Sequence, residues 1–164
     1  MGSGKTTVGS RVAAALGRPF VDNDALLERI IGSSAAEIAA RDGTDALHRA
    51  EAATLLDALG STVPSVIAAA ASTITDAGVR RVLSGSSWVV WLRADPAVLV
   101  SRLPGSATRP FRDRDPAQLV AEQARARDQW FDAVADLTVD TGREPVERVV
   151  ARVLASADER GQGV

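Results

Sequence analysis

The stretch Gly2-Ser3-Gly4-Lys5-Thr6-Thr7 matches the second half of the phosphate-loop motif G-x-x-x-x-G-K-[ST]. Glycines let the backbone curl so that successive N–H groups point at phosphate oxygens. A helix starting near Lys5 would add its positive N-terminal end. In this motif the lysine reaches the β- and γ-phosphates, and the next hydroxyl can ligate Mg²⁺. The stretch therefore predicts a site for ATP and Mg²⁺, with Thr6 as a metal ligand. A glycine-rich helix start without a ligand is the simpler alternative.

The residues after the loop alternate between helical and strand-like segments. A first helix is expected through about Leu16, because apolar residues recur on one face and Gly17 stops the pattern. Asp24 could cap the next helix. Further helices are expected near 25–31, 35–41, 46–59, 77–83, 95–102, 116–133 and 146–154. Residues 18–21 are interpreted as a loop that enters a short strand ending at 22–24, and further strands are expected near 65–71, 87–92 and 137–139. This alternation, together with the phosphate loop, predicts an α/β domain of the P-loop type, with a parallel sheet and helices on both faces.

The 164 residues fit a single domain, which we expect over residues 1–155, with a disordered tail over residues 156–164. The first glycine of the phosphate-loop motif would lie two positions before Met1, and the strand that leads into the loop would precede it. In such folds that strand is central and buried. We therefore expect a start upstream of Met1, and a chain that, as it stands, lacks its first, central strand.

Composition excludes several classes of protein. Hydrophobic residues make up 46% of the chain and charged residues 24%, which favours a folded core over disorder. A net charge of −2 argues against a dedicated nucleic-acid binder. The absence of cysteine excludes disulfides and thiolate metal sites, and a single histidine cannot make a typical zinc site. The sequence has no apolar run long enough for a membrane span and no visible secretory signal, so we expect a cytoplasmic protein without a membrane partner. We also expect a monomer that acts on a small molecule and has no nucleic-acid partner.

The order and spacing of several short motifs resemble those of shikimate kinase. The similarity spans about residues 2–155. Beyond the phosphate loop it rests on Leu-Gly-Arg-Pro-Phe at 16–20, Asp-Asn-Asp at 22–24, Gly-Ser-Ser at 32–34, Glu-Ile at 37–38, Asp-Gly at 42–43, His-Arg-Ala-Glu at 48–51, Thr-Arg-Pro at 108–110 and Val-Asp-Thr at 139–141. The resemblance implies a five-stranded parallel sheet, a closing lid, and ATP-dependent phosphorylation of a shikimate hydroxyl in aromatic amino acid biosynthesis.

The resemblance also implies roles for acidic residues and for the phosphate loop. Asp22 would help Thr6 to hold Mg²⁺, directly or through water. Asp24 would bind the substrate hydroxyls and act as base toward the attacking one. A carboxylate at the carboxyl end of a strand suits both roles. Taken alone, Asp22 and Asp24 are equally typical of a turn followed by a helix cap. The ATP site would consist of Gly2, Ser3, Gly4, Lys5, Thr6, Thr7 and Arg102, with Lys5 also catalytic.

Three arginines fall where the family keeps functional ones. Arg102 and Arg109 match lid arginines, and Arg109 would meet both the substrate and the transferring phosphoryl group. Such a charge acts when the lid closes and water is excluded. Arg127 matches an arginine that binds the substrate carboxylate, for which a planar guanidinium is suited. Without the resemblance, each would be interpreted as a solvated surface charge.

Two departures from the family pattern fall in the expected acceptor pocket. The family has Phe-Arg where this chain has Leu47 and His48, so histidine replaces the arginine that grips the carboxylate. The family also has three glycines where this chain has Ala70, Ala71 and Ser72. The added Cβ atoms restrict φ and fill space. His48, Ala70 and Ala71 nevertheless remain the expected substrate-binding positions.

Three functions therefore stay open from the sequence. The first is phosphorylation of shikimate or a related hydroxylated carboxylate. The second is a kinase for another small metabolite, such as gluconate or a nucleoside monophosphate, although the acidic and histidine-rich segment expected of gluconate kinases is not seen. The third is an ATP-binding homologue with impaired catalysis, for which the altered acceptor pocket is the argument.

Overall fold

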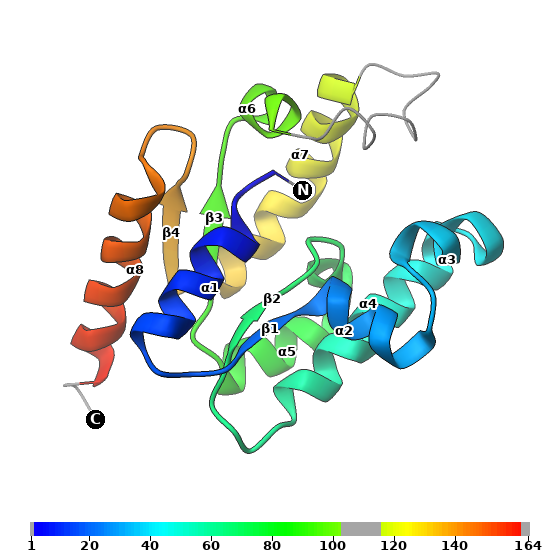
Figure 1. Ribbon diagram of the computed structural model, residues 1–164. Helices are drawn as coiled ribbons and strands as arrows, with labels where there is room; N and C mark the ends of the chain where they lie inside the picture. Colours follow the sequence, from blue (N-terminus) through cyan, green and yellow to red (C-terminus); the bar gives the residue numbers. More distant parts are fainter. Residues whose placement is uncertain (1, 103–115, 162–164) are drawn as a thin grey trace. The chain divides into compact units, whose positions relative to one another are not determined.

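The computed structural model describes residues 2–102 and 116–161, whose contacts divide the chain into two compact units (Figure 1). Unit 1 consists of Met1–Val8 and Val89–Val164, and unit 2 of Gly9–Trp88. The sequence predicted one domain over residues 1–155.

Unit 1 contains the parallel strand pair β3 (Val90–Arg93) and β4 (Leu137–Asp140), with Trp91 opposite Thr138. Helices described in the second part of this unit are α6 (Pro96–Ser101), α7 (Pro116–Val134) and α8 (Val146–Gly161). The Trp91 ring stacks on Phe131 of α7, with 5.2 Å between the ring centroids. Because alternate residues of a strand face opposite sides, Leu92 and its partner Val139 face away from α7. α8 runs along β4 (Figure 1), and Val139 and Val149 are buried there.

Helix α1 (Lys5–Ala15) begins in unit 1 and continues into unit 2. Unit 2 holds the second parallel strand pair, β1 (Phe20–Asp22) and β2 (Val66–Ala68), with Asp22 opposite Ala68. The other elements of this unit are α2 (Asn23–Ile31), α3 (Ala35–Asp42), α4 (Thr44–Leu59), the single 3₁₀ turn η1 (Thr73–Thr75) and α5 (Ala77–Ser86). Its core is formed by Ala52, Leu55 and Val79, with Ile67 and Leu83 against them.

The predicted α/β architecture with parallel strands is confirmed, and the first element of the described chain is α1. Helix α2 departs from the prediction at its start. Asp22, not Asp24, is the N-cap, because its side chain accepts from the backbone N–H of Asp24 at 3.0 Å. Gly32 ends α2 in the left-handed conformation, as a glycine can. The cap places Asp22 at the junction of strand and helix, and Asp24 in the first turn.

Strand β2 is shorter than the predicted 65–71, and the last helix is longer than predicted. β2 ends at Ala68, because the Ala70 carbonyl accepts from the N–H and the hydroxyl of Thr73 and so turns the chain into η1. α8 continues to Gly161, so the expected disordered tail is helical in its described part, 156–161. Four residues with good helix propensity follow Leu154, namely Ala155, Ala157, Glu159 and Arg160, and they favour the extension. No helix in the described residues is long and apolar enough to span a membrane.

Candidate active site

The phosphate loop lies in unit 1 and leads directly into α1. Gly4 accepts the first helical hydrogen bond, from the N–H of Val8 at 2.9 Å. Gly2 and Gly4 have φ angles of +78° and +86°, a region that residues with a Cβ rarely adopt. A Cβ on Gly2 would stand 2.6 Å from the carbonyl oxygen of Leu99 in α6. Glycine is therefore required at residue 2 by both conformation and space.

We expect Gly2→Ala to weaken nucleotide binding strongly and to destabilise the fold, because the methyl group collides with backbone that cannot rotate away. Gly4→Ala is the matched control. It meets the same unfavourable φ, about 1–2 kcal/mol, but its Cβ would touch only the Val8 side chain, at 3.9 Å. Titration calorimetry with ADP and thermal melting measure both effects. Equal losses in the two variants would contradict the collision argument.

A pocket of about 230 Å³ opens beside the loop within unit 1. Five predicted site residues line it: Gly2, Ser3, Gly4, Thr7 and Arg102. Its other lining residues are Val8, Thr141, Glu144, Val146 and Val149. Lys5 is half-buried at the first position of α1, and Thr6 follows it at the surface. The structure thus gathers most of the predicted nucleotide site around one pocket.

Arg102 makes hydrogen bonds both to the phosphate loop and to the residue that follows β4. Its Nη2 donates to the carbonyl oxygen of Thr141 at 2.7 Å, and its Nη1 reaches the carbonyl oxygen of Gly2 at 3.4 Å. Since the guanidinium stays charged, it supplies fixed positive potential at the pocket wall. Arg102 thus lies beside the phosphate loop, and its role in nucleotide binding stays a prediction.

The lining also includes a residue that the sequence analysis did not single out, Glu144. Its Oε1 accepts from Nη1 of Arg152 at 2.5 Å, whereas its Oε2 is buried without a hydrogen-bond partner among the described residues. An orphaned carboxylate oxygen, two left-handed glycines and a pocket beside a helix N-terminus fit a nucleotide that supplies both phosphate and hydrogen-bond donors. In the sequence, a ligand-binding role for Glu144 is indicated only by its place after the carboxyl end of a parallel strand, where ligands commonly bind.

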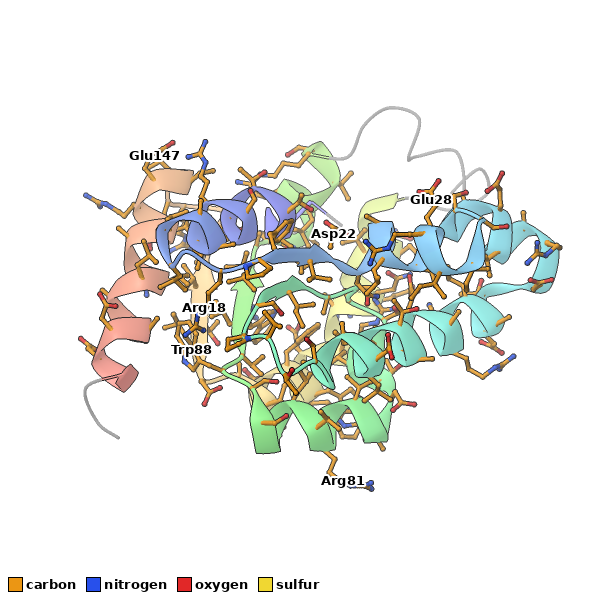
Figure 2. The ribbon with its side chains drawn as sticks, turned by 60° about the horizontal axis from the view of Figure 1, so that its bottom comes forward. Arg18, Asp22, Glu28, Arg81, Trp88 and Glu147 are labelled. Carbon is orange, nitrogen blue, oxygen red and sulfur yellow. The ribbon has the colours of Figure 1, made fainter. Side chains whose placement is uncertain are left out.

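The acidic residues lie in unit 2, at the junction of β1 and α2, where Figure 2 labels Asp22. Asp24 is exposed in the first turn of α2. Between them Asn23 is fully buried, and its Nδ2 donates to the backbone oxygen of Glu51 in α4 at 3.3 Å. Asn23 therefore fastens the acidic turn to α4, a role that the sequence did not reveal because an asparagine in a turn needs no tertiary partner.

The expected acceptor residues also lie in unit 2. His48 is half-buried on α4, one turn before Glu51, and Ala70 and Ala71 are half-buried after β2. The Ser72 hydroxyl donates to Oε2 of Glu51, and both residues are more than nine-tenths buried. The Ser72 hydroxyl therefore stabilises the buried carboxylate of Glu51 in α4.

We expect Ser72→Ala to destabilise the protein by about 1–3 kcal/mol, because a buried carboxylate oxygen loses a donor. Ser86→Ala is the control, since the Ser86 hydroxyl donates to a carbonyl on the exposed side of α5. Urea unfolding of both variants checks the difference. If Ser72→Ala cost no more than Ser86→Ala, the hydrogen bond to Glu51 would contribute nothing to stability.

The remaining predicted residues are distributed as follows. Arg127 is half-buried on α7 in unit 1 and is not without an interaction partner. Arg109 lies outside the described residues. Thr6 belongs to unit 1 and Asp22 to unit 2, so the proposed metal ligands come from separately described parts. A hydroxyl and a carboxylate are ligands suited to Mg²⁺, which commonly completes its shell with water and phosphate oxygens.

Three comparisons relate the chain to known proteins. A family model described as "Shikimate kinase" matches residues 1–158. A shikimate kinase of Cereibacter sphaeroides is 38% identical over 154 residues, which cover 93% of this chain and 76% of the relative. A shikimate kinase of Symbiobacterium thermophilum is 34% identical over 165 residues, covering 99% of this chain and 94% of the relative.

A search of solved structures also finds shikimate kinases. Shikimate kinase from Acinetobacter baumannii in complex with shikimate superimposes with a TM-score of 0.84 at 26% identity, covering 98% of this chain and 89% of that one. A gluconokinase from Sinorhizobium meliloti has a lower TM-score, 0.63, at 23% identity, and shares the fold alone. The likeness therefore extends over the whole described chain.

Proposed function

The chain belongs to the shikimate kinase family, and from this premise we propose that it transfers the γ-phosphoryl group of ATP to a hydroxyl of shikimate. The supporting observation is the pocket that the phosphate loop shares with Arg102 in unit 1. It combines left-handed glycines, a helix N-terminus and a cation, which together suit a nucleotide phosphate chain. The family uses ATP with Mg²⁺ and serves aromatic amino acid biosynthesis.

In the nucleotide half, the backbone of Gly2, Ser3 and Gly4 would bind phosphate oxygens. Lys5 would contact the γ-phosphoryl group during the transfer and offset its negative charge. Thr7 and Arg102 line the pocket. Thr6 and Asp22 would hold Mg²⁺, which, when bound, neutralises phosphate charge. The preference of this ion for oxygen ligands supports the assignment.

In the acceptor half, the exposed carboxylate of Asp24 would accept the proton of the attacking hydroxyl. Its place in the first turn of α2, fixed by the Asp22 cap and the Asn23 anchor, supports this role. His48, Ala70 and Ala71 would line the pocket for the ring and its carboxylate. Arg127 would bind the carboxylate, and Arg109 would meet both the acceptor and the transferring group.

A coupled assay of ADP release with a panel of acceptors tests the proposal. Shikimate should give turnover well above the ATP hydrolysis seen without an acceptor, and gluconate and AMP should not. A shikimate-independent rate, with a working positive control, would mean that the acceptor is another molecule. Stabilisation by Mg-ATP without turnover on any acceptor would favour an ATP-binding homologue that has lost catalysis.

We further propose that the chain acts as a cytoplasmic monomer without nucleic-acid or membrane partners. The cytoplasm supplies the ATP that the reaction consumes, and a net charge of −2 gives no general attraction to nucleic acid. Light scattering at micromolar concentration should give the mass of one 17.1 kDa chain. A dimer mass would contradict this part of the proposal.

A further inference from the structure

One face of α7 is partly buried, and Arg127 belongs to it. The half-buried positions of this stretch recur at the spacing of a single helical face, namely 124, 127, 128 and 131, whereas 125, 126, 129 and 130 are exposed. Phe131 of this face stacks on Trp91 of β3, with 5.2 Å between the ring centroids. Arg127 therefore lies on the face of α7 that packs against β3.

A second contact shows how α7 runs along β3. Nη2 of Arg93 donates to Oδ2 of Asp128 at 3.5 Å. Arg93 is the last residue of β3, two positions after Trp91 and on the same face of the strand. The contact at the end of the strand is thus made by the earlier residue of the helix, so α7 and β3 run in opposite directions. Arg127 consequently lies near the carboxyl end of β3, the end at which parallel sheets bind ligands.

Arg93 is held in place by its side chain and by its backbone. The guanidinium carbon lies 5.2 Å from the centroid of the Trp91 ring, which is a cation–π distance. The backbone oxygen of Arg93 accepts from the N–H of Thr141 at 2.7 Å and from the Thr141 hydroxyl at 3.2 Å. Thr141 lines the pocket at the phosphate loop. Arg93 therefore connects the wall of that pocket with the turn of α7 that carries Arg127.

The ion pair between Arg93 and Asp128 is poorly placed to stabilise the fold, because its side chains are 59% and 31% exposed. Its effect on a ligand is easier to derive. Asp128 follows Arg127 directly, and an unpaired carboxylate at this position would repel a carboxylate ligand that approaches Arg127. Arg93 offsets that charge and holds the side chain of Asp128 on β3.

We propose that Arg93 is a positioning residue for acceptor binding. By binding Asp128, it fixes the turn of α7 that carries Arg127 and offsets the negative charge next to Arg127. The ligand group concerned is a carboxylate, on which Arg93 acts through Arg127. The inference rests on the proposed function in one respect, the binding of the acceptor carboxylate by Arg127.

Titration calorimetry with shikimate and the complete chain, in the presence of Mg-ADP, tests the inference without turnover. Arg93→Gln should weaken shikimate binding about threefold to tenfold, because Asp128 then stands unpaired beside Arg127. Asp128→Asn should change the affinity by less than about twofold, because asparagine removes the repelling charge and keeps an acceptor for Arg93. Adding Asp128→Asn to Arg93→Gln should therefore restore most of the lost affinity.

Steady-state kinetics separates positioning from a general structural role. For Arg93→Gln, KM for shikimate should rise by the same factor as the dissociation constant, whereas kcat and KM for ATP should stay within about twofold of the wild type. Arg93→Lys, which keeps the positive charge, should retain part of the affinity. Arg125→Gln is the matched control for a lost charge, because Arg125 is exposed on α7 outside the packed face.

Two comparisons show whether Arg93 acts through Arg127. In an Arg127→Ala background, Arg93→Gln should have no further effect on kcat/KM for shikimate, since residues that act together are not additive. The methyl ester of shikimate, which lacks the carboxylate charge, should bind equally to the wild type and to Arg93→Gln. Thermal melting checks the fold of each variant; were Arg93→Gln unfolded, Arg93→Lys would supply the smaller loss of affinity.

Three results would overturn the inference: unchanged shikimate binding by Arg93→Gln, an equal loss for the methyl ester, or a loss that persists when Asp128→Asn is added. If the wild type phosphorylates shikimate and any of these results is found, the proposed function stands without this inference. A wild type that binds shikimate and shows the expected pattern, but transfers no phosphoryl group to it, would contradict the proposed function and leave the inference standing.

Discussion

Replacing Lys5 by alanine is expected to lower kcat for shikimate phosphorylation by about a thousandfold, the scale found when one charge-stabilising group is removed from a phosphoryl-transfer or oxyanion site. Lys5 is the first residue of α1, directly after the loop whose glycines shape the pocket. Charge moves onto the transferring group and the leaving oxygen during the reaction. A cation at this position therefore stabilises the transition state more than it stabilises bound ATP.

Steady-state kinetics with a coupled ADP assay measures the effect, and kcat should fall much more than KM for ATP rises. Lys5→Arg should recover only part of the rate, because a guanidinium is larger and planar. Arg18→Ala is the matched control for a lost positive charge, since Arg18 is exposed just after α1. A rate for Lys5→Ala within tenfold of the wild type would mean that Lys5 does not serve the transfer.

The second large effect is expected for Asp24→Asn, which should lower kcat by about 10²- to 10⁴-fold, the usual contribution of a general base. Asparagine has nearly the same shape, and the backbone N–H of Asp24, which donates to the Asp22 cap, is untouched. The variant should therefore keep its melting temperature and its affinity for ADP. A loss confined to turnover would locate the defect in the acceptor step.

Glu28→Gln is the control for the loss of a carboxylate on α2. Glu28 is exposed one turn after Asp24, where its side chain can be followed in Figure 2. This variant should keep the wild-type kcat and the wild-type KM for shikimate. Equal activity of Asp24→Asn and Glu28→Gln would contradict the role of Asp24 as base.

Local patterns in the sequence predicted most of the fold. The apolar stripe after the phosphate loop predicted α1, and the aromatic and β-branched residues around Trp91 predicted β3. Such patterns work because burial of one face determines the element. Boundaries were less predictable, since they depend on single hydrogen bonds. Examples are the bond that the Asp22 cap accepts from the N–H of Asp24 and the bonds that the Ala70 carbonyl accepts from Thr73 in the turn after β2.

The phosphate loop was predictable because its chemistry is encoded in consecutive residues. Glu144 and Arg152 were not, since a glutamate before a helix and an arginine eight residues later look like ordinary surface charges. The role of Asn23 in anchoring the acidic turn was not predictable for a similar reason, because its partner is the backbone oxygen of Glu51 in α4, 28 residues away. Contacts of this kind depend on tertiary packing, which short-range patterns do not report.

The acceptor segment shows how a departure from the family pattern can be understood only with the structure. The sequence indicated that Ala70, Ala71 and Ser72 replace three glycines. The structure adds that the new hydroxyl of Ser72 binds the buried carboxylate of Glu51. The substitution therefore brings its own stabilising contact, which would offset part of the freedom that the glycines supplied.

The most direct test of the proposed function follows the phosphoryl group itself. The purified chain is incubated with Mg²⁺, ATP labelled in the γ-phosphoryl group and shikimate, and the products are separated. The label should pass to shikimate as a phosphate monoester, in proportion to ADP formed, and little should be released when shikimate is omitted. Label found only in unchanged ATP or in inorganic phosphate, under conditions where Mg-ATP stabilises the protein against heat, would contradict the proposal that this chain phosphorylates shikimate.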